Sequence, residues 1–368
     1  MKRKSLLLMQ EAQLIGKRYR KDSIMQYLPN DPVRLTDDKT AILAIDQRAL
    51  PSETKYLELR NAAAVAEAIR TLAVRGAPCI GICAAYGVYV AACAHMQEEK
   101  NTFSAHLDAD AAVIASARPT AVNLSWAVNR MLQCKGRHLA ESPAEITEAL
   151  RTEAETIHAE DIDMCRRIAE NGLRLLPEGS RVITHCNAGA LATSRYGTGL
   201  GPLLLGAERG MTFHAFVDET RPLLQGARLT AYELHRAGID TTLMCDNMAS
   251  YLMAQGGITA CMVGCDRVAA NGDTANKIGT SGLAVLAQHY GVPFYVFCPS
   301  PTIDRSCKTG ADIRIEQREG DEITHLHFAK PVAPAGIRCL NPAFDITPAS
   351  LITAIITETG ILYPPFAF

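Results

Sequence analysis

The sequence has no marked excess of charge of either sign, which limits the class of partner. Its 368 residues carry 37 Lys and Arg against 39 Asp and Glu, for a formal net charge of −2. A protein that binds nucleic acid usually presents a strongly basic face. We therefore expect no nucleic-acid partner and favour a small molecule.

Three further signals are missing from the sequence: a C-x-x-C pair, a membrane span and a signal peptide. The 12 cysteines include no C-x-x-C pair, which in a chain of this size favours reduced, buried thiols. Gln288, His289 and Pro293 interrupt the apolar stretch 284–299, well short of the ~18 residues of a membrane span. Near the N-terminus, Leu6–Met9 is shorter than the ~7–15 apolar residues of a signal peptide. These features predict a cytoplasmic protein with no membrane partner.

The first half of the chain has mainly helical periodicity. Residues 1–40 are polar and broken by prolines, so we expect an irregular N-terminal extension. A strand is predicted over 41–46. Apolar residues then recur at helical spacing over 61–74, 80–96, 121–133 and 143–172. We expect a mainly helical N-terminal domain with a small sheet over 41–150.

The second half changes to short apolar runs that alternate with helical stretches. The predicted strands are 181–185, 213–218, 241–245, 260–264 and 294–298. Strands that alternate with helices of ~10–15 residues are typical of a parallel, doubly wound sheet. The sequence therefore predicts an α/β protein whose residues 151–368 form a Rossmann-like domain with a mostly parallel sheet.

Polar side chains follow four of these predicted strands. Cys186, Asp218, Asp246 and Asp266 each come at or directly after a strand end. Open α/β sheets place their ligands outside the carboxyl ends of the strands. The alternative is that Asp218 and Asp246 cap the helices that follow. Because the pattern repeats on four strands, we favour a binding or catalytic site.

Cys186 is the first candidate for chemistry. A lone cysteine is most often a core residue. Here a small-residue segment follows it, and a helix N-terminus or a nearby cation would stabilise a thiolate. A carboxylate shielded from water, such as Asp266, can act as a general acid, so the two form a plausible acid/base pair. His185 should point to the opposite face of the strand and is predicted to be structural.

Two segments suit a phosphate group. Arg75 and Gly76 come immediately before a predicted helix, where free N–H groups attract anions, and Asn276 and Lys277 precede another. The alternatives to phosphate binding are that Arg75 forms a surface salt bridge and that the side chain of Lys277 is simply solvated. The glycine-rich segment 197–201 does not directly follow a strand, and Pro202 stands where the last glycine of a dinucleotide loop would be. No nucleotide cofactor is predicted.

Metal-ligand spacing is weak. Cys79 and Cys83, like Cys261 and Cys265, are four residues apart, but no histidine completes a familiar tetrahedral set. We predict no metal site.

Long stretches of the sequence resemble the methylthioribose-1-phosphate isomerases, which are related to the regulatory subunits of translation initiation factor 2B. The motifs that carry the resemblance cover the chain from about residue 41 to its end. They are VRGAPCIGICAAYG (74–87), ARPTAVNLSWAVNRM (117–131), THCNAGALATSRYGTGLG (184–201), DETRPLLQGARLTAYEL (218–234), DNMASYLM (246–253), GCDRVAANGDTANKIGTSGLAVLA (264–287) and NPAFDITPASLITAIITETG (341–360).

The resemblance implies an aldose–ketose isomerase of methionine salvage that converts 5-methylthioribose 1-phosphate into 5-methylthioribulose 1-phosphate. The resemblance also implies that the enzyme needs no cofactor and that it forms a homodimer. Cys186 and Asp266 match the family's catalytic pair. The positions that match its substrate-binding residues are Arg75, Gly76, Ala77, Arg118, Gln225, Asn276 and Lys277. Arg118 and Gln225 enter only through the resemblance.

The sequence departs from the family's usual pattern at Ala188, Cys265 and Pro301, none of which removes the pair or an anchor. A 5-deoxyribose 1-phosphate isomerase of the same superfamily, or an enzyme that serves both sugars, could share every motif. A ribose 1,5-bisphosphate isomerase would need further basic groups for a second phosphate. A non-catalytic initiation-factor-like protein has no reason to keep both Cys186 and Asp266, so catalysis is favoured.

Overall fold

The computed structural model describes residues 31–119 and 121–368. Of the expected irregular extension, residues 1–30 lie outside the described residues. The remainder corrects the expectation, because Val33–Leu35 form strand β1. β1 pairs antiparallel with β2 (Ile42–Ile45), and Val33 lies opposite Ala44.

The N-terminal part combines a small antiparallel sheet with helices, as predicted. Its sheet has the order β1-β2-β3, where β3 is Tyr56–Leu59. The helices are α2 (Ala62–Arg70), α3 (Ala77–His95), α4 (Lys100–Ala115), α5 (Val122–Arg137) and α6 (Pro143–Leu173). β3 and α4 were not expected. α4 has no side-chain hydrogen bond at its N-cap, so the usual start signal is missing.

Helix α3 is the centre of the N-terminal core. It is the helix of the described segments that is long and apolar enough to cross a membrane by length and composition. However, 78% of its apolar window is buried inside the protein. It packs against α4, α5 and α6. Burial of this kind is typical of a core helix that is apolar all round.

The C-terminal part is built on a seven-stranded sheet of order β14-β13-β10-β7-β4-β5-β6. The strands are β4 (Arg181–His185), β5 (His214–Asp218), β6 (Asp240–Met244), β7 (Ala260–Gly264), β10 (Phe294–Phe297), β13 (Ala354–Thr357) and β14 (Gly360–Leu362). All neighbours pair parallel except β13 and β14. The predicted mostly parallel sheet is therefore confirmed.

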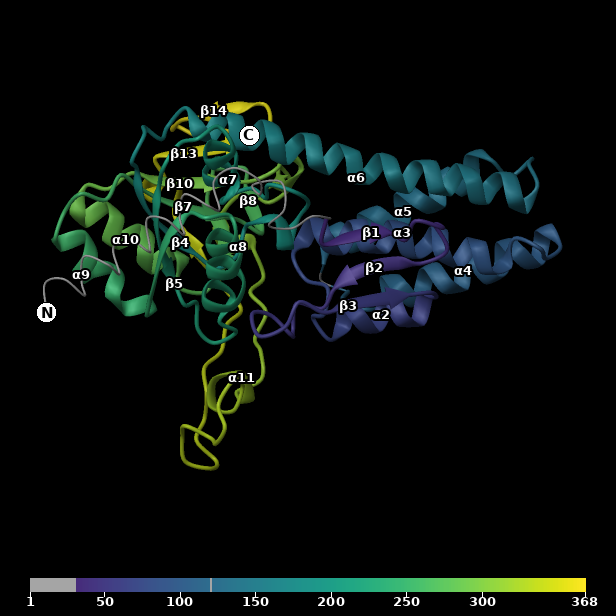
Figure 1. Cartoon of the computed structure of the whole chain (residues 1–368), viewed down its shortest axis with the longest axis horizontal. Coiled ribbons are helices and arrows are strands. Elements are labelled where there is room, and N and C mark those ends of the chain that lie inside the picture. The colour runs from purple at the N-terminus through teal and green to yellow at the C-terminus, as the bar shows by residue number, and fades with distance from the viewer. Residues whose placement is uncertain (1–30, 120) are drawn as a thin grey trace, which may run out of the picture.

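Helices cover both faces of this sheet. The shorter helices that cover it are α7 (Gly201–Glu208), α8 (Ala231–Arg236), α9 (Ala249–Ala254) and α10 (Thr280–Tyr290). A further helix, α11 (Asp321–Thr324), lies away from this sheet (Figure 1). Apolar residues of α6, α7 and α8 share one core with the sheet, and those of α9 and α10 share the other. Val182 and Ile183, successive residues of β4, lie in different cores. This is the alternation that a strand imposes.

A single helix of 31 residues, α6, joins the two parts (Figure 1). Ser142 and Glu145 form a capping box at its start. Leu150 and Ile157 belong to the N-terminal core, whereas Ile168 belongs to the core of the large sheet. Both cores therefore depend on residues of the same helix.

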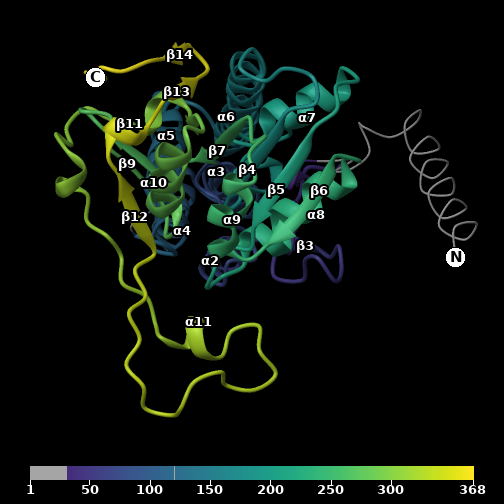
Figure 2. The same ribbon diagram turned by 90° about the vertical axis from the view of Figure 1, so that its left-hand side faces the viewer.

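A second, four-stranded sheet has the order β11-β8-β9-β12. Its strands are β8 (Arg267–Ala269), β9 (Thr274–Lys277), β11 (Ile303–Asp304) and β12 (Phe344–Thr347). Between β11 and β12 the chain extends away from the body as an arm that carries α11 (Figures 1 and 2). The base of this arm returns toward the candidate site described below.

Candidate active site at the carboxyl ends of β4 and β7

The strand order reverses between β4 and β7. From β4 the chain continues to β5 and β6 on one side, and β7 then pairs with β4 on the other side. Cys186 directly follows β4, and Asp266 follows β7 by two residues. Ligands of doubly wound sheets bind at such a switch point. The two residues proposed from the sequence as an acid/base pair therefore lie on adjacent strand ends.

The backbone of Cys186 is held in an unusual conformation. Its φ of +64° lies in the left-handed region, which L side chains rarely adopt. The Thr220 hydroxyl accepts a hydrogen bond from the Cys186 N–H at 2.8 Å, and the Thr230 hydroxyl donates to the Cys186 carbonyl at 2.6 Å. Two threonines from the segments after β5 thus fix both sides of this residue.

The thiol of Cys186 faces two cations. Burial raises the pKa of Cys186, while the charges of Arg75 and Lys277 lower it and the charge of Asp266 raises it. The side chain is half-buried. Burial is the largest of these effects, so the pKa of Cys186 is raised overall and the two cations limit the rise. Positive charge beside a thiol favours the thiolate, the reactive form.

Asp266 shares these cations. Desolvation by the surrounding protein raises its pKa, and Lys277, Arg75 and Arg118 lower it. Water nevertheless reaches the residue, which is exposed. A carboxyl group that water touches on one side and that protein desolvates on the other suits a general acid that meets a ligand from solvent.

Lys277 is buried on β9 and its ammonium lies 4.7 Å from the centre of the Phe344 ring. Burial lowers its pKa, and the charges of Cys186 and Asp266 raise it. Its neighbour Asn276 is also buried and donates to the Thr280 hydroxyl at 3.0 Å. The predicted position before a helix is confirmed, because α10 begins at Thr280.

Arg75 lies immediately before α3, where Gly76 is the N-cap and Ala77 the first helical residue. Gly76 has φ +93°, and a Cβ added there would lie 2.3 Å from the Cα of Ala192. No other residue fits this close approach without displacing the backbone. The turn therefore places Arg75 and the free N–H groups of α3 beside the segment that follows Cys186.

Arg118 and Gln225 complete the predicted set. Burial lowers the pKa of Arg118, and the charges of Glu316 and Asp266 raise it. Gln225 is buried, and its side-chain oxygen has no hydrogen-bond partner among the described residues. A buried acceptor without a partner is uncommon, and here it is left available to a ligand.

The arm contributes charges that sequence reasoning missed. Arg318 lowers the pKa of both Arg118 and Lys277, so its guanidinium acts on the same site. It forms ion pairs with Glu316 at 3.1 Å and with Glu322. Nothing in the local sequence marks these residues, because the fold of the arm brings them to the site.

His185 lies on the other side of β4, as predicted. One ring nitrogen lies 3.0 Å from an Asp218 carboxylate oxygen, and the other lies 2.9 Å from the carbonyl oxygen of Ile278. Asp246 accepts from the backbone N–H groups of Thr220 at 2.6 Å and Arg221 at 2.7 Å. Asp218 and Asp246 are thus structural, but they support neighbouring strands rather than the helices that the sequence suggested.

Two groups of the described residues have metal-ligand geometry. They are His185 with Asp218 and Asp246, and His95 with Glu98 and His106. In the first group both histidine nitrogens already have protein partners. In the second, His95 bonds Glu98 and Asp110 through its two nitrogens. The central histidine of each group thus uses both ring nitrogens within the protein, whereas one carboxylate oxygen of Asp218 has no partner among the described residues. The absence of a metal site stays a prediction.

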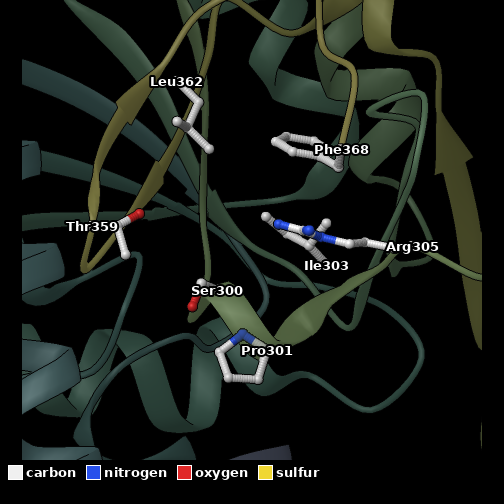
Figure 3. A pocket seen from close by; sticks show the side chains of 7 residues that line it. All are labelled: Ser300, Pro301, Ile303, Arg305, Thr359, Leu362 and Phe368. Atoms are coloured by element: carbon white, nitrogen blue, oxygen red, sulfur yellow. The ribbon is translucent and has the colours of Figure 1, made fainter.

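A pocket of about 380 Å³ lies elsewhere, near the C-terminal end of the chain (Figure 3). It is lined by Ser300, Pro301, Ile303, Arg305, Thr359, Leu362 and Phe368. None of the predicted site residues lines it. A pocket without a converging set of charged groups gives no reason to move the candidate site.

Comparison with known proteins shows the family of the chain. Residues 73–364 match the model of the Initiation factor 2 subunit family, and the chain belongs to this family. It is 56% identical over 336 residues to a methylthioribose-1-phosphate isomerase of Symbiobacterium thermophilum, covering 91% of this chain and 94% of the relative. It is 51% identical over 335 residues to a 5-deoxyribose 1-phosphate isomerase of Petrotoga mobilis, covering 91% and 96%.

A solved structure gives the same comparison in three dimensions. The crystal structure of 5-methylthioribose 1-phosphate isomerase from Pyrococcus horikoshii OT3 superimposes with a TM-score of 0.87 at 40% identity. The match covers 92% of this chain and 93% of that one. The two chains therefore share their overall fold.

Proposed function

We propose that the protein is an aldose–ketose isomerase that converts 5-methylthioribose 1-phosphate into 5-methylthioribulose 1-phosphate in methionine salvage. The observation that carries this is the convergence of Cys186, Asp266, Arg75 and Lys277 at one switch point. Its relatives include a methylthioribose-1-phosphate isomerase at 56% identity.

The substrate explains why such a site is needed. Its phosphate is on the anomeric oxygen, so the sugar cannot open to a free aldehyde and the ring must be opened by acid. We assign this step to Asp266, which protonates the ring oxygen as the bond from that oxygen to C1 breaks. Hydrogen then moves from C2 to C1, and C2 becomes the ketone carbon as its hydroxyl loses a proton. C1 is reduced and C2 oxidised within one molecule, so the balance needs no outside oxidant.

Cys186 serves the hydrogen transfer in either of two ways. As a thiolate it removes the C2 proton and a cis-enediol forms, after which a proton is added at C1. Alternatively, hydride moves directly and the thiolate takes the proton of the C2 hydroxyl. Arg75 and Lys277 oppose the rise that burial causes in the pKa of Cys186 and so act toward the thiolate that both routes need. Solvent deuterium at C1 of the product, measured by NMR, would count against the hydride route.

The remaining predicted residues bind the substrate. Arg75, with the N–H groups of Gly76 and Ala77 at the start of α3, holds the phosphate. Lys277 and Arg118 add positive charge that a phosphate dianion balances. Gln225 offers its unpartnered oxygen to a sugar hydroxyl, and Asn276 lines the same side.

A 5-deoxyribose 1-phosphate isomerase is the second candidate, because a relative with that name is 51% identical. The discriminating experiment is turnover of the two sugar phosphates side by side, measured as kcat/KM by product NMR. A clear preference for the methylthio sugar supports the first proposal. Preference for the deoxy sugar keeps the mechanism and changes the pathway. Absence of turnover with both would favour a non-catalytic member of the Initiation factor 2 subunit family.

We further propose that the protein works as a cytoplasmic homodimer with no nucleic-acid or membrane partner, and that a domain boundary falls near residue 150. Its near-neutral charge fits a small-molecule substrate. Light scattering coupled to gel filtration tests the dimer. A mass of about 80 kDa, twice the 39.8 kDa of the chain, is expected, and a monomer mass would reject it.

A further inference from the structure

A buried carboxylate that the proposed mechanism does not use lies behind the candidate site. Glu233 is on α8 and has no exposed surface. It accepts hydrogen bonds from the Asn187 side-chain nitrogen at 2.8 Å and from the Leu191 N–H at 3.4 Å. A Cβ added at Gly189 would lie 2.5 Å from its carboxylate oxygen. The carboxylate is therefore packed directly against the loop that follows Cys186.

Asn187 connects this carboxylate to the phosphate-facing arginine. Its side-chain oxygen accepts from Arg75 at 2.8 Å, and its carbonyl oxygen accepts from the same guanidinium at 3.4 Å. Its side-chain nitrogen faces Glu233, and also donates to the Thr230 hydroxyl at 3.1 Å. Thr230 in turn donates to the carbonyl of Cys186.

The order of donors and acceptors in this chain of contacts follows from its two ends. A carboxylate only accepts hydrogen bonds and a guanidinium only donates them. The amide of Asn187 must therefore present its nitrogen to Glu233 and its oxygen to Arg75. If the amide turned over, its nitrogen would face the N–H groups of Arg75, and two donors would meet.

We propose that Glu233 is a positioning residue for the phosphate group of the substrate: by orienting the Asn187 amide it fixes the guanidinium of Arg75 at the start of α3. This inference rests on the proposed function, in which Arg75 holds the phosphate. Glu233 does not touch the substrate and acts only through Asn187.

Exchange of the two functional groups tests the proposal. Glu233→Gln keeps the size of the side chain but offers one donor and one acceptor to two donors, Asn187 and Leu191. Asn187→Asp places two carboxylates opposite each other. In the double variant the new amide nitrogen at position 233 donates to the new carboxylate at position 187. The amide oxygen at position 233 accepts from Leu191, and the carboxylate at position 187 also accepts from Arg75. The double variant therefore restores the order of donors and acceptors from position 233 through position 187 to Arg75, and loses only the donation from position 187 to the Thr230 hydroxyl.

The measurements are kcat and KM on 5-methylthioribose 1-phosphate and the Kd of inorganic phosphate by calorimetry, at pH 8. This pH is above the pKa of about 7 to which burial raises Glu233. We expect Glu233→Gln to raise KM and the phosphate Kd about tenfold with a smaller change in kcat, and the double variant to return both to within about threefold of wild type.

Glu358→Gln is the matched control. Glu358 is also buried and accepts a hydrogen bond from the Ser300 N–H at 2.8 Å, but no interaction links it to the site among the described residues. It should lower Tm and leave KM and the phosphate Kd unchanged. A Glu233→Gln variant that behaves in the same way, or a double variant no better than the worse single variant, overturns the proposal. If wild type turns over neither sugar phosphate, the proposed function fails, and the phosphate Kd values still decide the positioning role.

Discussion

His185 and Cys186 are consecutive residues at the end of the same strand, yet they face two different kinds of polar cluster. Both ring nitrogens of His185 have protein partners, Asp218 and the Ile278 carbonyl. The hydrogen bonds of Cys186 to Thr220 and Thr230 involve its backbone, and its thiol faces the charges of Arg75, Lys277 and Asp266.

These two clusters differ in whether their charges and polar atoms find partners within the protein. On the His185 side, both ring nitrogens have protein partners, and of the Asp218 carboxylate one oxygen is bonded and the other has no partner among the described residues. On the Cys186 side, three cations act on the single carboxylate of Asp266, which leaves an excess of positive charge for a ligand. Both clusters contain titratable groups at strand ends, so residue type alone does not separate them.

The largest expected effect is on catalysis. Cys186→Ser and Asp266→Asn should each lower kcat by about 10³-fold or more, since general acid–base groups contribute roughly 10²–10⁴-fold. The free energy of unfolding should change by less than about 1 kcal/mol, because neither side chain completes a hydrogen-bond network. Steady-state kinetics and urea unfolding check both statements. Retention of activity in either variant would contradict the assigned pair.

His185→Ala should give the opposite result. It removes one partner of a buried pair and leaves Asp218, of which 1% is exposed, without its hydrogen bond. Breaking a buried pair costs about 3 kcal/mol, which a shift of the urea midpoint measures. If His185→Ala proves as stable as wild type, the His185–Asp218 pair does not stabilise the fold.

The same cluster should make stability depend on pH. Burial raises the pKa of Asp218 to about 6, and its hydrogen bond from His185 opposes the shift. The pKa of His185 is also raised, by Asp218 and despite burial. When the pKa of a group is higher in the folded than in the unfolded protein, the folded state binds the proton more tightly. The contribution of that proton to the free energy of unfolding is then complete below the unfolded pKa and is lost as pH rises through the folded pKa. Between about pH 4 and 7 wild type should lose about 2 kcal/mol more than Asp218→Asn. Parallel curves for the two proteins would reject this.

The smallest effect expected is at Thr220, which connects the two clusters. Its N–H donates to Asp246 and its hydroxyl accepts from the Cys186 N–H. Thr220→Val removes the hydrogen bond from the Cys186 N–H and the one that the Thr220 hydroxyl donates to the Asp218 carbonyl at 3.1 Å. The Cys186 N–H is left without a partner, at a cost of about 1–2 kcal/mol. We expect kcat to fall about tenfold as Cys186 leaves its left-handed conformation. Thr242→Val, which alters an exposed hydrogen bond with His214, is the control.

The positions of the residues in these two clusters could largely be predicted from the sequence. Alternation along a strand separates His185 from Cys186, and the strand ends at Cys186 and Asp266 follow from the spacing of apolar runs. Pairing of β4 with β7 could not be predicted from spacing, because β5 and β6 lie between them in the sequence.

The sequence did not predict the site contacts that form between segments far apart in the chain. Arg318 reaches the site through the fold of the arm, and Glu233 reaches it through Asn187. Arg118 and Gln225 were found by resemblance alone. Strand β1 was missed because its three residues pair with β2 in a segment that proline and charge made look irregular.

Helix α6 has a mechanical consequence. At about 1.5 Å per residue, its 31 residues form a strut of about 46 Å. Both cores bury residues of this one helix, so neither core can unfold without exposing apolar residues of α6. We therefore expect the molecule to unfold in a single cooperative transition. The only tryptophan, Trp126, lies on α5 with 47% of its surface exposed, so it reports from the N-terminal part alone. Its fluorescence should therefore follow the same thermal curve as the circular dichroism of the whole chain.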